Sequence, residues 1–154
     1  MLEGKEQEMT TIQSRKVRGQ VLYSSAVDTV EEAVEEAISK GVSLRFADLS
    51  GVDFRKVKGL RLADIYEARL DGCTVDWNSH ALLAEILRKA AGEDYGRRKF
   101  AGFVAVSYDW CWPKILEEGK DDAALSWALD VFKSYATEGD GAPDCVTLRP
   151  GLAK

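Results

Sequence analysis

The chain has 154 residues, 45% of them hydrophobic and 31% charged, which is ordinary for a single globular domain. Its formal net charge of −5 disfavours binding to nucleic acid, which normally requires a basic face. The sequence shows neither a secretory signal nor an apolar run near the roughly 20 residues that span a bilayer, so we expect a cytoplasmic protein without a membrane partner.

The N-terminal part, residues 16–41, is predicted to form a strand followed by a helix. Residues 1–15 are polar and lack a period, so we expect a disordered start. The short apolar run Val17–Tyr23 predicts the strand. Asp28 and Glu31 have the spacing of a capping box, in which each side chain satisfies a backbone N–H at a helix start. The helix is therefore expected to begin there.

Apolar residues then recur at every fifth position across residues 42–77. The large members of this pattern are Leu44, Leu49, Phe54, Leu60, Ile65, Leu70 and Val75. One residue is inserted near Val57–Gly59, where the spacing is six. Because a period of five fits neither a helix at 3.6 nor a strand at 2, it indicates an internal repeat. Each unit would form one side of a square coil with its apolar residues inside.

Three of the five-residue units share a motif, in the forms A-D-L-S-G (Ala47–Gly51), V-D-F-R-K (Val52–Lys56) and A-D-I-Y-E (Ala63–Glu67). These units resemble the pentapeptide-repeat family, and the lead-in T-V-E-E-A-V-E-E-A resembles short phage or prophage members of it. The resemblance implies an α+β fold: a right-handed quadrilateral β-helix of under two turns, capped by the N-terminal strand and helix and by C-terminal helices. The duplex-DNA mimicry known in the family requires a long acidic rod, so we disfavour it for this short coil.

Residues 78–139 have a helical period and predict about four helices. The expected helix starts are Asn78 or Ser79, Asp94, Trp110 and Asp121 or Asp122. The tail, residues 140–154, contains two prolines and is expected to be irregular. A coil of under two turns would leave both ends of its core open. We therefore expect the coil and its caps to form one fused domain over residues 1–154.

The sequence carries no recognisable catalytic or metal-binding motif. His80 is the only histidine and has no partner at a motif spacing, which favours a structural or solvent-exposed role. The three cysteines, Cys73, Cys111 and Cys145, match no zinc spacing. We therefore expect free thiols, no metal and no cofactor.

Aromatic and basic residues of the helical region are the candidates for binding. Trp110 and Trp112 lie two positions apart, so one helix cannot turn both toward the core, and one of them is expected at the surface. The basic run Arg97–Lys99 forms a solvated helix face or contacts an acidic partner. The candidate binding residues are Trp77, His80, Arg97, Arg98, Lys99, Trp110 and Trp112.

We therefore expect a non-enzymatic binding protein that is phage-encoded and acts on a host macromolecule, with a protein as the favoured partner. The alternative is a protein that binds or sequesters a small, nucleotide-like ligand at the junction of coil and helices. An enzyme is the least favoured class. The identity of the target and the formation of a homo-oligomer are left open by the sequence.

Overall fold

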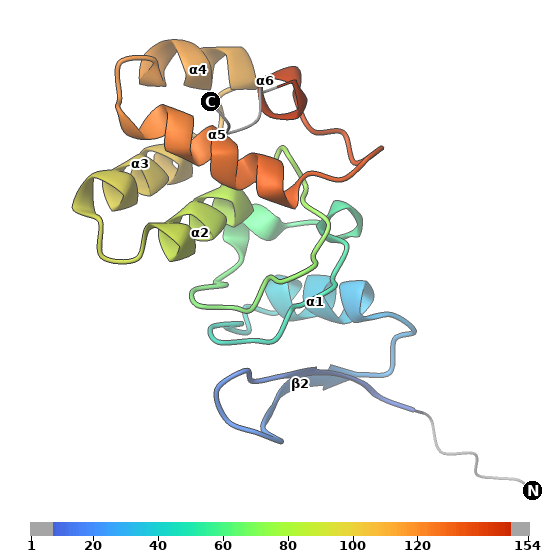
Figure 1. The fold of residues 1–154 in the computed structure, drawn as a ribbon. Coiled ribbons are helices and arrows are strands. Elements are labelled where there is room, and N and C mark those ends of the chain that lie inside the picture. The colour runs from blue at the N-terminus through green and yellow to red at the C-terminus, as the bar shows by residue number, and fades with distance from the viewer. Residues whose placement is uncertain (1–7, 149–154) are drawn as a thin grey trace, which may run out of the picture.

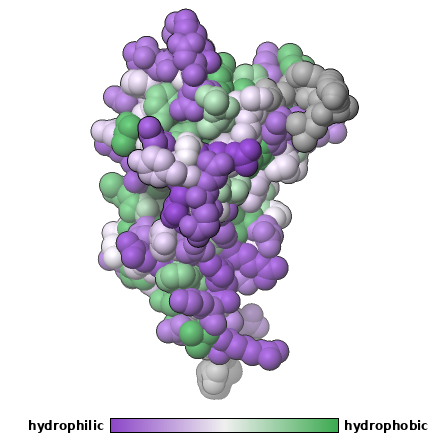
Figure 2. Space-filling view, turned by 60° about the vertical axis from the view of Figure 1, so that its left-hand side comes forward, coloured by the Kyte–Doolittle hydropathy of each residue, from purple (hydrophilic) through white to green (hydrophobic). Residues whose placement is uncertain are grey.

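The computed structural model describes residues 8–148. The molecule is elongated, with a β-hairpin at one end, helix α1 above it, stacked turns in the middle and a group of helices at the other end (Figure 1). A space-filling view has the same elongated outline, and on the face it displays hydrophobic residues are scattered among hydrophilic ones (Figure 2).

The hairpin consists of β1 (Thr10–Gln13) and β2 (Val21–Ser25), which pair antiparallel. The prediction of a disordered start is therefore wrong for β1, while residues 1–7 lie outside the described part of the chain. The polar sequence of β1 gives little alternation of its own. Its pairing with β2 and the burial of Ile12, which is 1% exposed, hold it in place.

Helix α1 (Val30–Ser39) begins one residue later than the capping-box spacing predicted. Thr29 is the N-cap, and its side chain accepts a hydrogen bond from the N–H of Glu32. The Glu32 carboxylate in turn accepts from the N–H groups of Asp28 and Thr29. Threonine therefore occupies the cap in place of the aspartate, and the apolar stripe of the helix packs onto the core.

The stacked turns, residues 42–77, run in two layers joined by backbone hydrogen bonds. The N–H groups of Leu44, Leu49 and Phe54 each donate to a carbonyl oxygen 20 residues further on, at distances of 2.9, 3.0 and 2.9 Å. Most positions of the five-residue period are buried, as the pattern predicted, while Val42 and Ala63 are half-buried. Those no more than 5% exposed are Leu44, Ala47, Leu49, Val52, Phe54, Leu60, Ile65, Ala68, Leu70, Cys73 and Val75.

The predicted quadrilateral β-helix is wrong. The hairpin is the only sheet in the described residues, and the molecule is mostly helical. Between the two layers of turns there are isolated bridges, Asp48 to Arg69 and Asp53 to Thr74, and no strand. The chain bends at every fifth residue, which leaves too few consecutive ladder bonds for a strand to form. Two 3₁₀ turns, Phe54–Lys56 and Leu60–Leu62, occupy the place of a regular corner.

The insertion predicted near Val57–Gly59 lies between these two 3₁₀ turns. Gly59 has φ of +82°, in the left-handed region that favours glycine, and it precedes the second turn. Val57 is buried, so the extra residue widens the corner without opening the core.

Five helices follow the stacked turns. They are α2 (His80–Ala91), α3 (Tyr95–Val106), α4 (Trp112–Gly119), α5 (Ala124–Tyr135) and the short α6 (Asp144–Thr147). The predicted helix starts Ser79 and Asp94 are confirmed. Each is the N-cap of its helix, because its side chain accepts a hydrogen bond from a backbone N–H in the first turn of α2 or α3. The prediction of an irregular tail is wrong for α6, which buries Val146 against the rest of the core.

Candidate functional site

A concave feature with an apolar floor lies between α2, α3 and the corner formed by residues 57–66. We call it the α2–α3 groove. It consists of two hollows, of about 480 and 600 Å³, and Ala81 and Ala105 line both of them. The smaller hollow continues toward Tyr66 and Arg88, and the larger one, which we call the His80 hollow, continues toward residues 55–61.

The groove exists because its floor is built from small residues. They come from the corner and from both helices, and they are Ala63, Ala81, Ala84, Ala101, Gly102 and Ala105. Two of the residues that line the groove are large, exposed aromatic side chains. Tyr108 is 49% exposed and Tyr66 is 41% exposed. An apolar groove with exposed aromatic residues is typical of a surface that binds a partner.

Cationic side chains stand at both ends of the groove. Arg88 and Arg98 line the smaller hollow, and Lys58 and Arg61 line the His80 hollow. Within residues 8–148 the side chains of Lys58 and Arg98 make no hydrogen bond or ion pair. These two charges are therefore available to a ligand in a chain whose net charge is negative.

His80, at the start of α2, is 5% exposed and lines the larger hollow. Its Nδ1 lies 3.3 Å from the carbonyl oxygen of Val104 and 3.4 Å from the hydroxyl oxygen of Ser107. Nδ1 is thus turned toward the end of α3. The other ring nitrogen, Nε2, has no hydrogen-bond partner in the described part of the chain.

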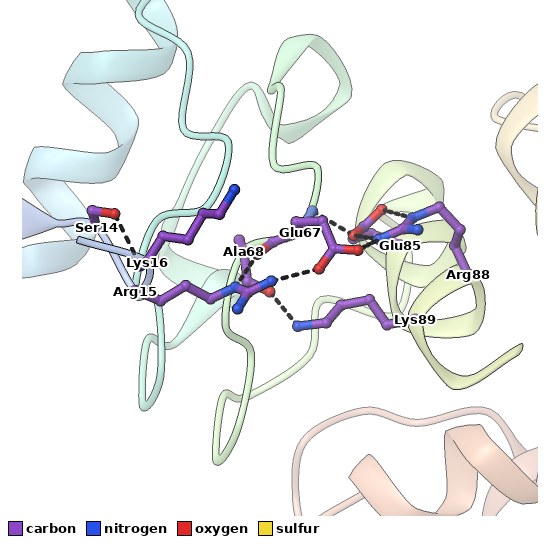
Figure 3. A network of polar contacts seen from close by, with 8 residues as sticks. All are labelled: Ser14, Arg15, Lys16, Glu67, Ala68, Glu85, Arg88 and Lys89. Carbon is purple, nitrogen blue, oxygen red and sulfur yellow. Dashed lines mark hydrogen bonds and ion pairs between the residues drawn. The ribbon is translucent and has the colours of Figure 1, made fainter. Parts of the chain in front are cut away.

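An ion-pair network fixes α2 against the stacked turns beside the groove (Figure 3). The Arg88 guanidinium donates to both carboxylate oxygens of Glu85, at 2.9 and 2.8 Å, and to Glu67 at 2.9 Å. Arg15, from the turn of the hairpin, reaches the same Glu67 carboxylate. Lys89 donates to the carbonyl oxygen of Ala68. Three segments that are distant in sequence are held together here, beside the groove.

The same network sets the charge state of its members. The hydrogen bond and charge of Arg88 lower the pKa of the Glu67 carboxyl below its ordinary value. The two carboxylates raise the pKa of Arg88 in turn. The Arg88 guanidinium also lies over the Tyr66 ring, 4.4 Å from its centroid. The cation is therefore held in place from two sides and is less available to a ligand than Arg98.

The three tryptophans predicted to bind a partner pack against other aromatic residues and do not line the groove. Trp77 is 4% exposed and lies against Trp112 and Phe132, with ring centroids 6.5 and 6.0 Å away. The Trp112 indole N–H donates to the Trp77 carbonyl oxygen at 2.9 Å. Trp110 is half-buried, edge-on to Phe103 at 5.8 Å. Trp77 and Trp112 therefore join the aromatic core, and Trp110 covers part of α3.

The predicted basic run diverges along α3. Arg97 lies over the Trp127 ring at 5.0 Å, Lys99 lies near the Tyr95 ring at 5.8 Å, and Arg98 points to the groove. Of the seven residues predicted from the sequence, the structure brings only His80 and Arg98 to the α2–α3 groove.

Sequence reasoning missed the residues that contribute most to the groove. Lys58 and Arg61 lie beside the inserted residue of the five-residue pattern, and Tyr66 and Tyr108 occupy outward or terminal positions. The break in the period was the available signal. An interruption of a repeat marks the place where the chain can present side chains outside the packed pattern.

Other chemistry is not assembled in the described residues. No group of three or more His, Cys, Asp or Glu side chains in residues 8–148 is arranged to hold a metal ion. Burial raises the pKa of the Cys73 thiol to about 11, and burial also raises that of Cys145. No helix in this part of the chain is long and apolar enough to cross a membrane.

Comparison with known proteins finds no relative of this chain. No family model, curated protein or solved structure matches the chain. The pentapeptide-repeat resemblance therefore stays a prediction carried by the quoted motifs.

Proposed function

We propose that the protein is a non-enzymatic binding protein whose α2–α3 groove takes an acidic, partly apolar segment of a protein partner. The observation that carries this proposal is the combination of an apolar floor with cations at both ends of one groove. Apolar side chains of the partner would cover the small-residue floor, and its carboxylates would face Arg98 at one end and Lys58 and Arg61 at the other.

The chemical class of the partner is argued from the groove. The resemblance to short phage or prophage pentapeptide-repeat proteins supports a phage-encoded protein and brings no activity with it, so action on a host macromolecule rests on the groove alone. The apolar floor of the groove favours a protein over a nucleic acid, because a phosphate backbone would face apolar side chains there.

The proposal is tested by blocking the groove. Ala105 is exposed on α3 and lines both hollows, so Ala105→Trp fills the groove at its midpoint. Ala90→Trp, at an exposed site on α2 that lines neither hollow, is the matched control. Peptides are selected from a random library against the unmodified protein and measured by fluorescence anisotropy at low and high salt.

We expect the selected peptides to combine Asp and Glu with large apolar residues, to weaken with salt, and to lose binding to the Ala105→Trp variant alone. Selected peptides that bind both variants equally, or that are basic, would refute the groove as the binding surface.

A small anionic ligand of nucleotide-like chemistry is the second candidate. It is favoured by the His80 hollow, whose volume of about 600 Å³ suits a small molecule and which lies at the predicted junction of coil and helices. A thermal-shift screen with nucleotides separates the two candidates. A rise in the melting temperature that is lost in the Lys58→Glu variant supports the small ligand, and no change in melting temperature with any nucleotide excludes it.

A further inference from the structure

We propose that the His80 hollow is an oxyanion-binding pocket that takes a phosphate-type or carboxylate group. This inference rests on the proposed function, because the hollow is one end of the α2–α3 groove. It adds the chemical class of the group bound there and the residues that bind it.

The first component is the N-terminus of α2. This helix has 12 residues, and its first N–H groups, those of His80 and Ala81, have no acceptor within residues 8–148. Ser79 caps the helix by accepting from the N–H of Leu82 at 3.4 Å, which leaves the other two donors open. Asn78, Ser79, His80 and Ala81 all line the hollow. The unpaired donors and the helix dipole favour negative charge at this point.

The second and independent component is the His80 ring. His80 is 95% buried and its ring lines the hollow, yet Nε2 has no partner in the described residues. Nε2 is not among the fully enclosed unpaired atoms of this part of the chain, so it opens onto solvent at the hollow. Nδ1 is accounted for by Val104 and Ser107 on the far side of the ring. A ligand atom in the hollow would take the place of solvent at Nε2.

Ser107 allows the ring to present the donor that an anion needs. The hydroxyl oxygen of Ser107 lies 3.0 Å from the Val104 carbonyl oxygen and 3.4 Å from His80 Nδ1. When Nδ1 carries the proton, Nδ1 donates to Val104. When Nε2 carries the proton, the Ser107 hydroxyl can turn and donate to Nδ1. The ring can therefore offer an Nε2–H donor to the hollow without leaving Nδ1 unpaired.

Charge on the rim completes the pocket. Lys58 and Arg61 line it as cations, and Arg61 lies over the Tyr108 ring, 4.1 Å from its centroid. Arg55 also lines it, although its guanidinium is engaged by Asp53. Asp76 is the one carboxylate among the lining residues, and one of its oxygens accepts from the N–H of Asn78 at 3.0 Å. The surplus of positive charge favours a dianion over a monoanion.

The chemistry is shared by a phosphate on a free ligand and a carboxylate on a partner segment, and an NMR experiment separates the two. Because His80 is the only histidine, its imidazole gives a single set of signals in the full-length protein. These signals are followed during titration with inorganic phosphate and, separately, with acetate, at constant ionic strength and pH.

We expect a saturable shift of the His80 signals with phosphate, and ¹⁵N shifts in the bound state that place a proton on Nε2. Lys58→Glu and Arg61→Glu should each weaken phosphate binding by roughly ten-fold or more. Lys99→Glu, an exposed change of the same charge on α3, should change it by less than about two-fold, because screening removes distant charges. Tighter binding of phosphate supports a phosphate-bearing ligand, and equal binding of acetate supports a partner carboxylate.

Failure to saturate with either anion, or equal weakening in the Lys58→Glu and Lys99→Glu proteins, would overturn the pocket. Peptide binding that is lost in the Ala105→Trp variant would stand in that case, so failure of the pocket is distinguishable from failure of the groove. The His80 spectrum of each variant without ligand reports whether that variant is folded.

Discussion

Replacing Arg88 by Met tests the contribution of the ion-pair network beside the groove. Arg88 makes two hydrogen bonds to Glu85, whose side chain is 9% exposed, and one to Glu67, whose side chain is 28% exposed. Met retains most of the apolar stem of the side chain and removes the charge. The substitution therefore leaves the Glu85 carboxylate buried without its counter-ion.

The size of the loss follows from this burial. Removing one partner of a fully buried pair costs roughly 3–5 kcal/mol, and a surface pair contributes about 0–1 kcal/mol. The Arg88 side chain is 21% exposed and Glu67 is more open than Glu85, so we expect Arg88→Met to lower the free energy of unfolding by about 2 kcal/mol. The Glu85→Gln/Arg88→Met double variant removes the unpaired charge and keeps an oxygen that can accept from the Glu67 N–H. It should be about 1 kcal/mol more stable than Arg88→Met alone.

Urea denaturation of the four proteins of this double-mutant cycle gives these differences, provided that the m-values agree. Lys120→Met is the control, since Lys120 and Glu117 are 2.8 Å apart with side chains 59% and 66% exposed, and it should change the free energy of unfolding by less than about 0.5 kcal/mol. A double variant no more stable than Arg88→Met would refute the argument that an uncompensated Glu85 charge causes the loss.

Gly59→Ala should lower the free energy of unfolding by about 1 kcal/mol in urea denaturation, since φ there is +82°, and an unchanged midpoint would argue against the strained corner. Iodoacetamide at about pH 8 should label the exposed Cys111 first and the buried Cys73 only on unfolding. A pKa of about 11 leaves roughly a thousandth of the Cys73 thiol ionised at that pH. Equal labelling of Cys73 and Cys111 in the folded protein, measured by mass spectrometry, would contradict this. The pKa of Glu67 is lowered from 4.5, so its contribution to stability is full above about pH 4.5 and is lost as pH falls through the lower value in the folded state. The difference in unfolding free energy from Glu67→Gln should therefore be constant above about pH 4.5 and shrink as the pH falls below it, and a difference that stays constant at lower pH would count against the pairing with Arg88.

The buried pattern and most helices could be predicted from the sequence because local chemistry determines them. The five-residue period places Leu49 and Phe54 inside, and the caps Ser79 and Asp94 start α2 and α3. The secondary structure of residues 42–77 could not be predicted in the same way. Apolar residues point inward in any stacked turn, whether or not it contains strands. A strand also requires consecutive ladder hydrogen bonds, and the five-residue pattern does not show whether they form. Strand β1 was missed because it depends on its pairing partner more than on its own composition.

The candidate site was less predictable than the fold. The sequence favoured large aromatic residues, yet Trp77 is buried in the core and the half-buried Trp112 packs against it. The groove arises from alanines on three elements that come together only in the folded chain, and no single segment marks it. His80 was expected to be structural or exposed, and it is buried beside a hollow with one ring nitrogen unpaired in the described residues, an arrangement that depends on where α3 ends.

The register of the stacked turns governs how the chain tolerates changes in length. The layers are joined by bonds between residues 20 positions apart, from Leu44 to Asp64 and from Phe54 to Thr74. Inserting one or two residues within a layer would displace the later donors from their acceptors. A whole additional layer would preserve every pairing and would move the hairpin away from the helical end by roughly 4.8 Å, the usual spacing of hydrogen-bonded chains. The stacked turns thus act as a spacer whose length changes in fixed steps, and its present two layers bring Arg15 of the hairpin within reach of the network on α2.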